Sequence, residues 1–175
     1  GMMELIPSLM NAWNNKQDDI QKTIKQVNEY LINSNTSVPG SNLDRNTLDN
    51  AFYDFKERFD NEFGGFGSAP KFPSPHNLIF LLRYYKIFDE KNALNMVTTT
   101  LDKMRLGGIF DHIGYGFHRY STDKNWFLPH FEKMLYDQAM ISMAYLEAFE
   151  ATKDEKYAAI VEEIFSYVIR DMLNE

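Results

Sequence analysis

The chain has 175 residues, no cysteine and a formal net charge of −7, with 18 Lys and Arg against 25 Asp and Glu. The length suffices for one domain with a hydrophobic core, and the lack of cysteine excludes disulfides, thiol nucleophiles and cysteine zinc sites. The acidic balance argues against nucleic-acid binding, no apolar run approaches the ~20 residues of a membrane span, and no signal peptide is visible, so we expect a cytoplasmic protein with no membrane contact.

The first third of the chain has apolar side chains at helical spacing. They predict one helix or two over residues 5–31, followed by a polar loop over 34–42. A stripe headed by Leu48 and continued by three phenylalanines then predicts an amphipathic helix over about 44–62.

The middle of the chain alternates between loops rich in glycine and proline and further helices. Residues 63–75 cannot be helical, but Ser74 offers an N-cap and Pro75 a first helical position. The helix that follows, 76–88, is apolar almost all round, whereas 91–106 is apolar on one face only.

A second long loop begins at Gly107 and extends to about Leu128. Pro129 is expected to open the next helix, which runs to about residue 152, and the last helix covers about 154–173. No convincing strand pattern is present, although 117–120 is compatible with a short extended piece.

Helices that are apolar on one face (44–62, 91–106 and 154–173) therefore alternate with helices that are apolar on most faces (76–88 and 131–151). The long loops rich in glycine and proline precede only the second kind. Antiparallel neighbours joined in this way form an inner and an outer layer, with both long loops at one end. The free N–H groups of the inner helices point to that end, which is where we expect a ligand site. The helices that are apolar on most faces would form the inner layer, and those that are apolar on one face would form the outer layer.

The two loops carry long and specific motifs. Residues 64–75 read GGFGSAPKFPSP, and residues 107–139 read GGIFDHIGYGFHRYSTDKNWFLPHFEKMLYDQA. These runs resemble the helical domain of the thioredoxin-domain-containing family related to spermatogenesis-associated protein 20 and YyaL. One departure is Tyr115, at a place where that family commonly has a third glycine, which would narrow the loop or change its backbone angle.

The resemblance implies an all-α fold of antiparallel hairpins that forms part of an (α/α)6 toroid, similar to the N-acylglucosamine 2-epimerases and the six-hairpin glycosidases. It also implies a thioredoxin-like domain before the helical part, which these residues do not include. We therefore expect residues 1–175 to form a single helical domain, equivalent to about the first half of a toroid.

The histidines of the second loop are the best candidates for acid–base chemistry, since histidine changes its charge near neutral pH. The similarity to toroid epimerases implies that His118 and His130 would move a proton beside a carbonyl; the alternative is that each forms a structural hydrogen bond. Glu132 is a third candidate, although we expect it in a first helical turn, where a negative charge is favourable for structural reasons alone.

The remaining candidates would bind a substrate or hold the loops. Arg119 would clamp a hydroxyl or an anion, or pair with Asp111 or Asp123, which are themselves candidate carboxylates. Trp126 and Phe66, with Phe117 and Tyr120 beside them, would form a stacking floor for a sugar or simply a core. Two further candidates are Lys71, which either points into the rim or lies on the surface, and Tyr136, which would share the face of Glu132.

Two functional hypotheses follow from these residues and from the resemblance. The first is a carbohydrate-active protein, a sugar-epimerase-like isomerase or a glycosidase-like enzyme, with a site in the two glycine-rich loops. The second is a non-catalytic scaffold or interaction module associated with a thioredoxin-like domain. We expect no metal site and no cofactor, an ordinary surface ion pair between Lys133 and Asp137, and a homodimer through exposed edge helices.

Overall fold

The computed structural model describes residues 1–35, 40 and 43–174. The predicted loop over 34–42 therefore lies mostly outside the described residues. Contacts divide the chain into two units, Gly1–Leu43 and Asp44–Glu175, where we expected one domain, and each unit is described by itself.

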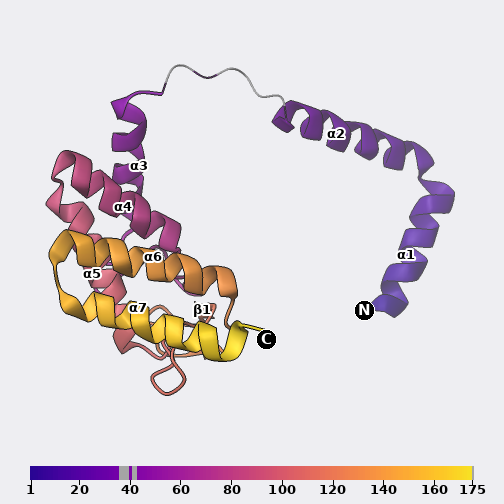
Figure 1. Cartoon of the computed structure of the whole chain (residues 1–175). Coiled ribbons are helices and arrows are strands. Elements are labelled where there is room, and N and C mark those ends of the chain that lie inside the picture. Colours follow the sequence, from indigo (N-terminus) through magenta and orange to yellow (C-terminus); the bar gives the residue numbers. More distant parts are fainter. Residues whose placement is uncertain (36–39, 41–42, 175) are drawn as a thin grey trace. The chain divides into compact units, whose positions relative to one another are not determined.

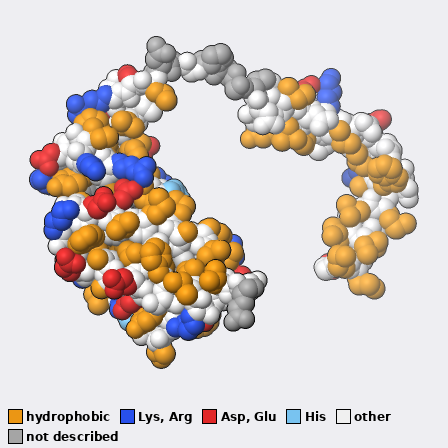
Figure 2. Space-filling model, in the orientation of Figure 1, with side chains coloured by type: hydrophobic (Ala, Val, Ile, Leu, Met, Phe, Trp, Pro, Cys, Tyr) orange, Lys and Arg blue, Asp and Glu red, His pale blue; other side chains and the backbone are white. Residues whose placement is uncertain are grey.

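The first unit consists of two helices, α1 (Met2–Asn15) and α2 (Gln17–Asn35), which contact each other. Neither helix contains a buried residue. Figure 2 shows apolar side chains along both helices, and those exposed include Leu5, Leu9, Trp13, Ile24, Val27 and Leu31.

The second unit is built almost entirely from helices (Figure 1). Its elements in chain order are α3 (Arg45–Arg58), α4 (Pro75–Phe88), α5 (Lys91–Leu106), β1 (Tyr120–Ser121), β2 (Pro129–His130), α6 (Leu135–Thr152) and α7 (Glu155–Tyr167), which continues as a π-helical turn (Val168–Met172). The two strands are antiparallel, with Tyr120 opposite His130. The predicted all-α fold of antiparallel hairpins is confirmed.

The inner layer is formed by α4 and α6, which lie side by side in Figure 1. The outer helices α3 and α5 pack on α4, and α7 packs on α6. Leu81 of α4 and Tyr145 of α6 are fully buried, as expected of helices that are apolar on most faces.

Short turns close the end of the unit where α4 and α6 finish. Asp89 and Lys153 follow these helices in the left-handed conformation, with φ of 53° and 61°. The next residues, Glu90 and Asp154, cap the outer helices by accepting a hydrogen bond from a backbone N–H two residues on. Both long loops consequently lie at the other end, as predicted.

Two helix boundaries and one helix cap differ from the prediction. The helix α3 stops at Arg58, since Asp60 starts a tight turn with Gly64 and Gly65. Pro129 does not open α6 but belongs to β2, so α6 begins six residues later. Ser74 precedes α4 without a side-chain capping bond. No helix within the described residues is long and apolar enough to cross a membrane.

Candidate functional site

The two glycine-rich loops meet, as predicted. Lys71 and Ser121 exchange two backbone hydrogen bonds, each of 2.8 Å between nitrogen and oxygen. The indole Nε1 of Trp126 donates to the Phe63 carbonyl at 2.8 Å. Side chains of both loops are thereby brought together at the end where the inner helices begin.

The first loop opens with a turn that is closed by a buried ion pair. Asp60 N–H donates to the Gly65 carbonyl, and Gly64 N–H donates back to the Asp60 carbonyl. Lys71, which is 0% exposed, donates from Nζ to the Asp60 carboxylate at 2.7 Å and to the Gly64 carbonyl at 2.9 Å. The ammonium group therefore fastens the turn to the segment that enters α4.

The second loop repeats this turn with other residues. Asp111 N–H donates to the Gly116 carbonyl, and Tyr115 N–H donates to the Asp111 carbonyl. Lys133 donates from Nζ to the Asp111 carboxylate at 2.8 Å and to the Tyr115 carbonyl at 2.7 Å. The segment that enters α6 is thus anchored in the same way, and the predicted pair of Lys133 with Asp137 does not form.

Tyr115 takes the place that Gly64 has in the first turn. Its φ is 66°, against 69° for Gly64, so the tyrosine keeps a left-handed backbone angle that residues other than glycine rarely adopt. The departure from the family pattern therefore leaves the backbone of the turn unchanged.

Both turn carboxylates have a lowered pKa. Burial raises the pKa of Asp60, but hydrogen bonds from Lys71 and from two backbone N–H groups lower it by more. The same balance, with Lys133 as the donor, holds the pKa of Asp111 well below its usual range. Asp111 was expected to bind a substrate or to pair with Arg119, and the structure instead uses it to hold the loop.

Three predicted binding residues are part of the packing within and around the loops. Trp126 is fully buried, which agrees with the alternative that it forms core and not an exposed stacking floor. Lys71, expected at the rim or on the surface, lies 5.4 Å from the centre of the Trp126 ring. Phe66 packs its ring against Phe55 and Phe59 of the outer helix region, with centroids 5.3 and 6.0 Å apart.

Asp123 organises the connection between β1 and β2. Its carboxylate accepts hydrogen bonds from the backbone N–H groups of Asn125, Phe127 and Leu128. These bonds lower its pKa, although burial acts in the opposite direction. The carboxylate therefore stabilises the loop through these backbone hydrogen bonds, and it forms no ion pair with Arg119.

An exposed row of rings runs across both loops. The Phe72 ring, 47% exposed, lies 4.9 Å from that of Tyr120, which stacks at 4.9 Å on the imidazole of His130. Nδ1 of His130 is 3.8 Å from the Glu132 carboxylate, and Glu132 accepts a hydrogen bond of 2.9 Å from Arg119. We call these five residues the rim cluster.

Glu132 reaches the rim cluster from an extended segment. Its carbonyl accepts a hydrogen bond from Arg119 N–H at 2.7 Å, and α6 begins three residues later. The expectation that Glu132 lies in a first helical turn was therefore wrong. Tyr136, in the first turn of α6, is 55% exposed; Glu132 and, to a smaller extent, Tyr136 raise the pKa of Arg119.

His118 has different neighbours from His130. It is 8% exposed, its ring meets the Phe131 ring edge-on at 5.5 Å, and its Nδ1 is buried without a hydrogen-bond partner among the described residues. Burial and the nearby Lys133 charge lower its pKa. The third loop histidine, His112, contacts Arg105 and the Gly107 carbonyl.

Asp137 was missed as a candidate. It lies in the first turn of α6 with 9% of its surface exposed. Burial raises its pKa, while the Arg119 charge acts in the opposite direction. The spacing in the sequence predicts a pair of Asp137 with Lys133. Asp137 has no such partner in the structure, because Lys133 pairs with Asp111, which is 22 positions away.

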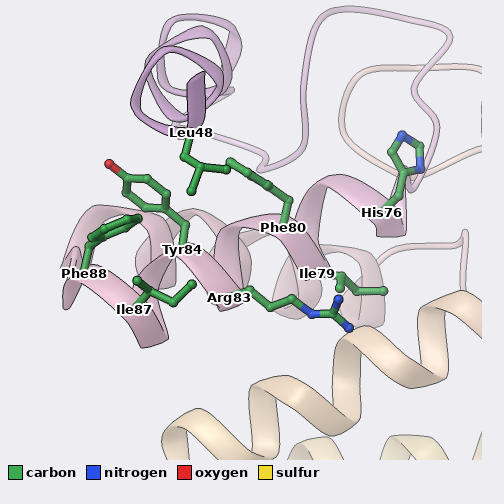
Figure 3. A pocket seen from close by; sticks show the side chains of 8 residues that line it. All are labelled: Leu48, His76, Ile79, Phe80, Arg83, Tyr84, Ile87 and Phe88. Carbon is green, nitrogen blue, oxygen red and sulfur yellow. The ribbon is translucent and has the colours of Figure 1, made fainter. Parts of the chain in front are cut away.

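Other features of the second unit lie away from the rim cluster. A cavity of about 340 Å³ is lined by Leu48 of α3 and by α4 residues from His76 to Phe88 (Figure 3). Arg83 extends from it toward α6, where it bonds to Glu147 at 2.8 Å. In the part of the chain that the structure describes, no group of three or more His, Asp or Glu side chains is arranged to hold a metal ion.

Comparison with known proteins identifies relatives of the whole segment. No family model matches the chain. It is 40% identical over 182 residues to spermatogenesis-associated protein 20 of Mus musculus and 39% identical over 180 residues to that of Homo sapiens, in each case over 98% of this chain and 23% of the relative. An uncharacterised protein of Caenorhabditis elegans is 32% identical over 96% of this chain and 24% of its own length.

Two solved structures share the fold. A sugar epimerase from a ruminal bacterium aligns with a TM-score of 0.64 and 17% identity, over 71% of this chain and 35% of that one. Cellobiose 2-epimerase from Bacillus thermoamylovorans aligns with a TM-score of 0.62 and 17% identity, over 74% and 38%. The chain is therefore similar over almost its whole length to a part of spermatogenesis-associated protein 20 that makes up 23% of that protein, and it shares part of the (α/α)6 fold of the sugar epimerases.

Proposed function

We propose that the rim cluster is this chain's share of a carbohydrate site in a sugar-epimerase-like or glycosidase-like protein. The observation that carries the proposal is the row formed by Phe72, Tyr120 and His130, which draws on both glycine-rich loops and ends at the ion pair of Glu132 with Arg119. The epimerase-like fold supports the substrate class, as an analogy of architecture.

The chemistry of the row suits a sugar ring. An aromatic face matches the apolar C–H face of a pyranose, and a few polar groups at the edge of an apolar surface fix a ligand's orientation. Arg119 offers N–H donors and Glu132 offers acceptors to hydroxyl groups. Phe72, His130 and the ion pair are exposed to solvent, and Tyr120 is half-buried.

Proton transfer would fall to His130, whose Nδ1 lies 3.8 Å from the Glu132 carboxylate; Glu132 would orient the imidazole and stabilise its protonated form. For His118 the buried Nδ1 favours the structural alternative, because a ligand on the exposed row does not reach a buried atom. Since the chain spans about a quarter of its curated relatives, a sugar on this row would also face parts of a longer protein, and binding is a more direct test than turnover.

The test is a titration of the isotope-labelled chain with cellobiose and with N-acetylglucosamine, followed by NMR. The backbone amides of Tyr120 and His130 are expected to shift with a common dissociation constant. Phe72→Ala removes one ring of the row and should weaken binding by about tenfold. Phe127→Ala, which removes a more exposed ring of the second loop that is not part of the row, is the control and should leave binding unchanged.

Two results would overturn the carbohydrate site. One is that neither sugar moves the amides of the row at any concentration. The other is that Phe72→Ala and Phe127→Ala bind alike, because the row would then have no part in recognition.

The second candidate is a non-catalytic scaffold or interaction module associated with a thioredoxin-like domain. The observation in its favour is the extent of exposed apolar surface, both on α1 and α2 and in the cavity of Figure 3. A purified thioredoxin-like domain from a full-length relative that binds the chain, in the absence of any response to sugars, would favour this function. The cytoplasmic location stays a prediction under either function.

A further inference from the structure

The Glu132 carboxylate lies beside two other side chains of the rim cluster. Its Oε2 accepts a hydrogen bond of 2.9 Å from Nη1 of Arg119, and the same oxygen is 3.8 Å from Nδ1 of His130. The main chain supports this arrangement, because Arg119 N–H donates to the Glu132 carbonyl at 2.7 Å and Tyr120 is paired with His130 across the two strands. One carboxylate oxygen is therefore shared by a guanidinium group and an imidazole.

The imidazole of His130 is oriented from two sides. Its ring stacks on that of Tyr120, with centroids 4.9 Å apart and 21° between the planes, and its Nδ1 is the nitrogen that faces Glu132. A separation of 3.8 Å is too long for a direct hydrogen bond. The carboxylate nevertheless favours a proton on the nitrogen that faces it, because a lone pair at that position would be repelled by the negative oxygen.

The position of the proton decides which nitrogen of His130 can act as a base. A neutral imidazole has one N–H donor and one nitrogen with a free lone pair, and only the second can accept a proton. With the proton on Nδ1, the lone pair is on Nε2. The side chains of His130 and Glu132 are each nearly half exposed, so a ligand on the row can reach the ring.

We propose that Arg119 is a positioning residue: it holds Glu132 beside His130, so that the neutral imidazole carries its proton on Nδ1 and offers Nε2 to the ligand as the base. This inference rests on the proposed carbohydrate function and adds to it the atom that would take the proton. Arg119 acts here through Glu132, because its Nη1 bond keeps an exposed side chain from turning to solvent.

His112 provides the opposite arrangement within the same chain. Nη1 of Arg105 lies 3.0 Å from Nδ1 of His112, and Nε2 of His112 lies 3.1 Å from the Gly107 carbonyl oxygen. An arginine can only donate a hydrogen bond and a carbonyl can only accept one, so neutral His112 has its proton on Nε2. The two histidines are therefore expected to be different tautomers, and His112 serves as an internal reference.

The test is a long-range nitrogen–proton NMR spectrum of the imidazole rings at about pH 8.5, where an ordinary histidine is neutral. In the unmodified chain, His130 should favour the Nδ1–H form by about fivefold, the ratio expected of an exposed interaction with one charge, while His112 shows the Nε2–H form. Glu132→Gln removes the negative charge and Arg119→Gln releases the carboxylate, so both should turn His130 mainly to the Nε2–H form. Lys124→Gln, which removes an exposed cation of the same loop, is the matched control and should leave His130 unchanged.

The spectrum is recorded without sugar, so its outcome is separate from that of the sugar titrations. A majority of Nε2–H at His130 in the unmodified chain would overturn the inference and leave the carbohydrate site standing. If Glu132→Gln changes the tautomer but Arg119→Gln does not, Arg119 has no positioning role, and the inference is again overturned. If the tautomers are as expected but neither sugar shifts the amides of Tyr120 and His130, the positioning role is supported and the carbohydrate function fails.

Discussion

Lys71 and Lys133 occupy equivalent places in two copies of one turn. Each ammonium group bonds to the aspartate that opens its loop and to the carbonyl four residues after that aspartate. Each lysine also stands shortly before an inner helix, α4 or α6. The two helix entries are therefore fixed by the same kind of ion pair, and each lysine is next in sequence to a member of the rim cluster, Phe72 or Glu132.

Loss of one of these lysines should destabilise the second unit strongly. Lys71→Met leaves the Asp60 carboxylate without its charged partner, and breaking one half of a buried pair costs about 3 kcal/mol or more. Urea unfolding followed by circular dichroism gives the free energy of unfolding. The matched control is Lys91→Met, whose pair with Asp89 is exposed and should be worth at most about 1 kcal/mol; equal effects of the two substitutions would contradict the prediction.

The first turn tolerates no side chain at Gly64. A Cβ at this position would lie 2.7 Å from the Thr100 Cα, and the φ of 69° adds backbone strain. Gly67 has a similar φ of 77° with nothing within 4 Å of its Cβ position. Gly67→Ala should therefore cost about 1 kcal/mol from the backbone alone, and Gly64→Ala about 2 kcal/mol more from overpacking. Thermal unfolding of both variants checks this, and similar melting temperatures would show that α5 yields to the added methyl group.

The ion pair of the second turn should appear in the acid stability of the protein. The folded pKa of Asp111 lies below the unfolded value of about 3.9. Ionised Asp111 therefore adds stability above that value, and this contribution is lost as the pH falls through the folded pKa. The free energy of unfolding between about pH 5 and pH 2 should fall less steeply in Asp111→Asn than in the unmodified chain. Parallel pH profiles would mean that Asp111 has the same pKa in both states.

The helices and their layers could be predicted because their signals are local. Apolar residues on most faces of α4 and α6, and on one face of α5 and α7, indicate which helices lie inside. The long loops before the inner helices place both loops at one end. None of these inferences depends on a contact between residues far apart in the sequence.

The contents of the loops were harder to predict, because their contacts are between distant residues. The buried Trp126 donates a hydrogen bond to the carbonyl of Phe63, which is 63 positions away. Aromatic composition alone does not distinguish a core tryptophan from an exposed one. Pro129 is compatible with a helix start as well as with a strand, and its partner Ser121 decides for the strand.

One pattern in the sequence does predict the repeated turn. Phe59-Asp60 is followed by Gly65-Phe66, and Phe110-Asp111 is followed at the same spacing by Gly116-Phe117. The bridges between each pair of phenylalanines are part of the turn in the structure. This repeat predicts that Asp60 and Asp111 open equivalent turns, but not their lysine partners, which follow 11 and 22 residues later.

The edge helices of the second unit are expected to mediate self-association. Phe165 of α7 is 52% exposed and Tyr53 of α3 is 59% exposed, and apolar side chains on helices without an outer neighbour favour contacts between copies. Sedimentation velocity over a range of concentrations should show a dimer, and Phe165→Glu should shift it toward monomer. Ile113→Glu, at a loop position that is 94% exposed, is the control and should leave the dimer intact. A monomer mass that does not change with concentration would show that these faces do not pair, and that the apolar surface serves a different protein or the rest of a longer chain.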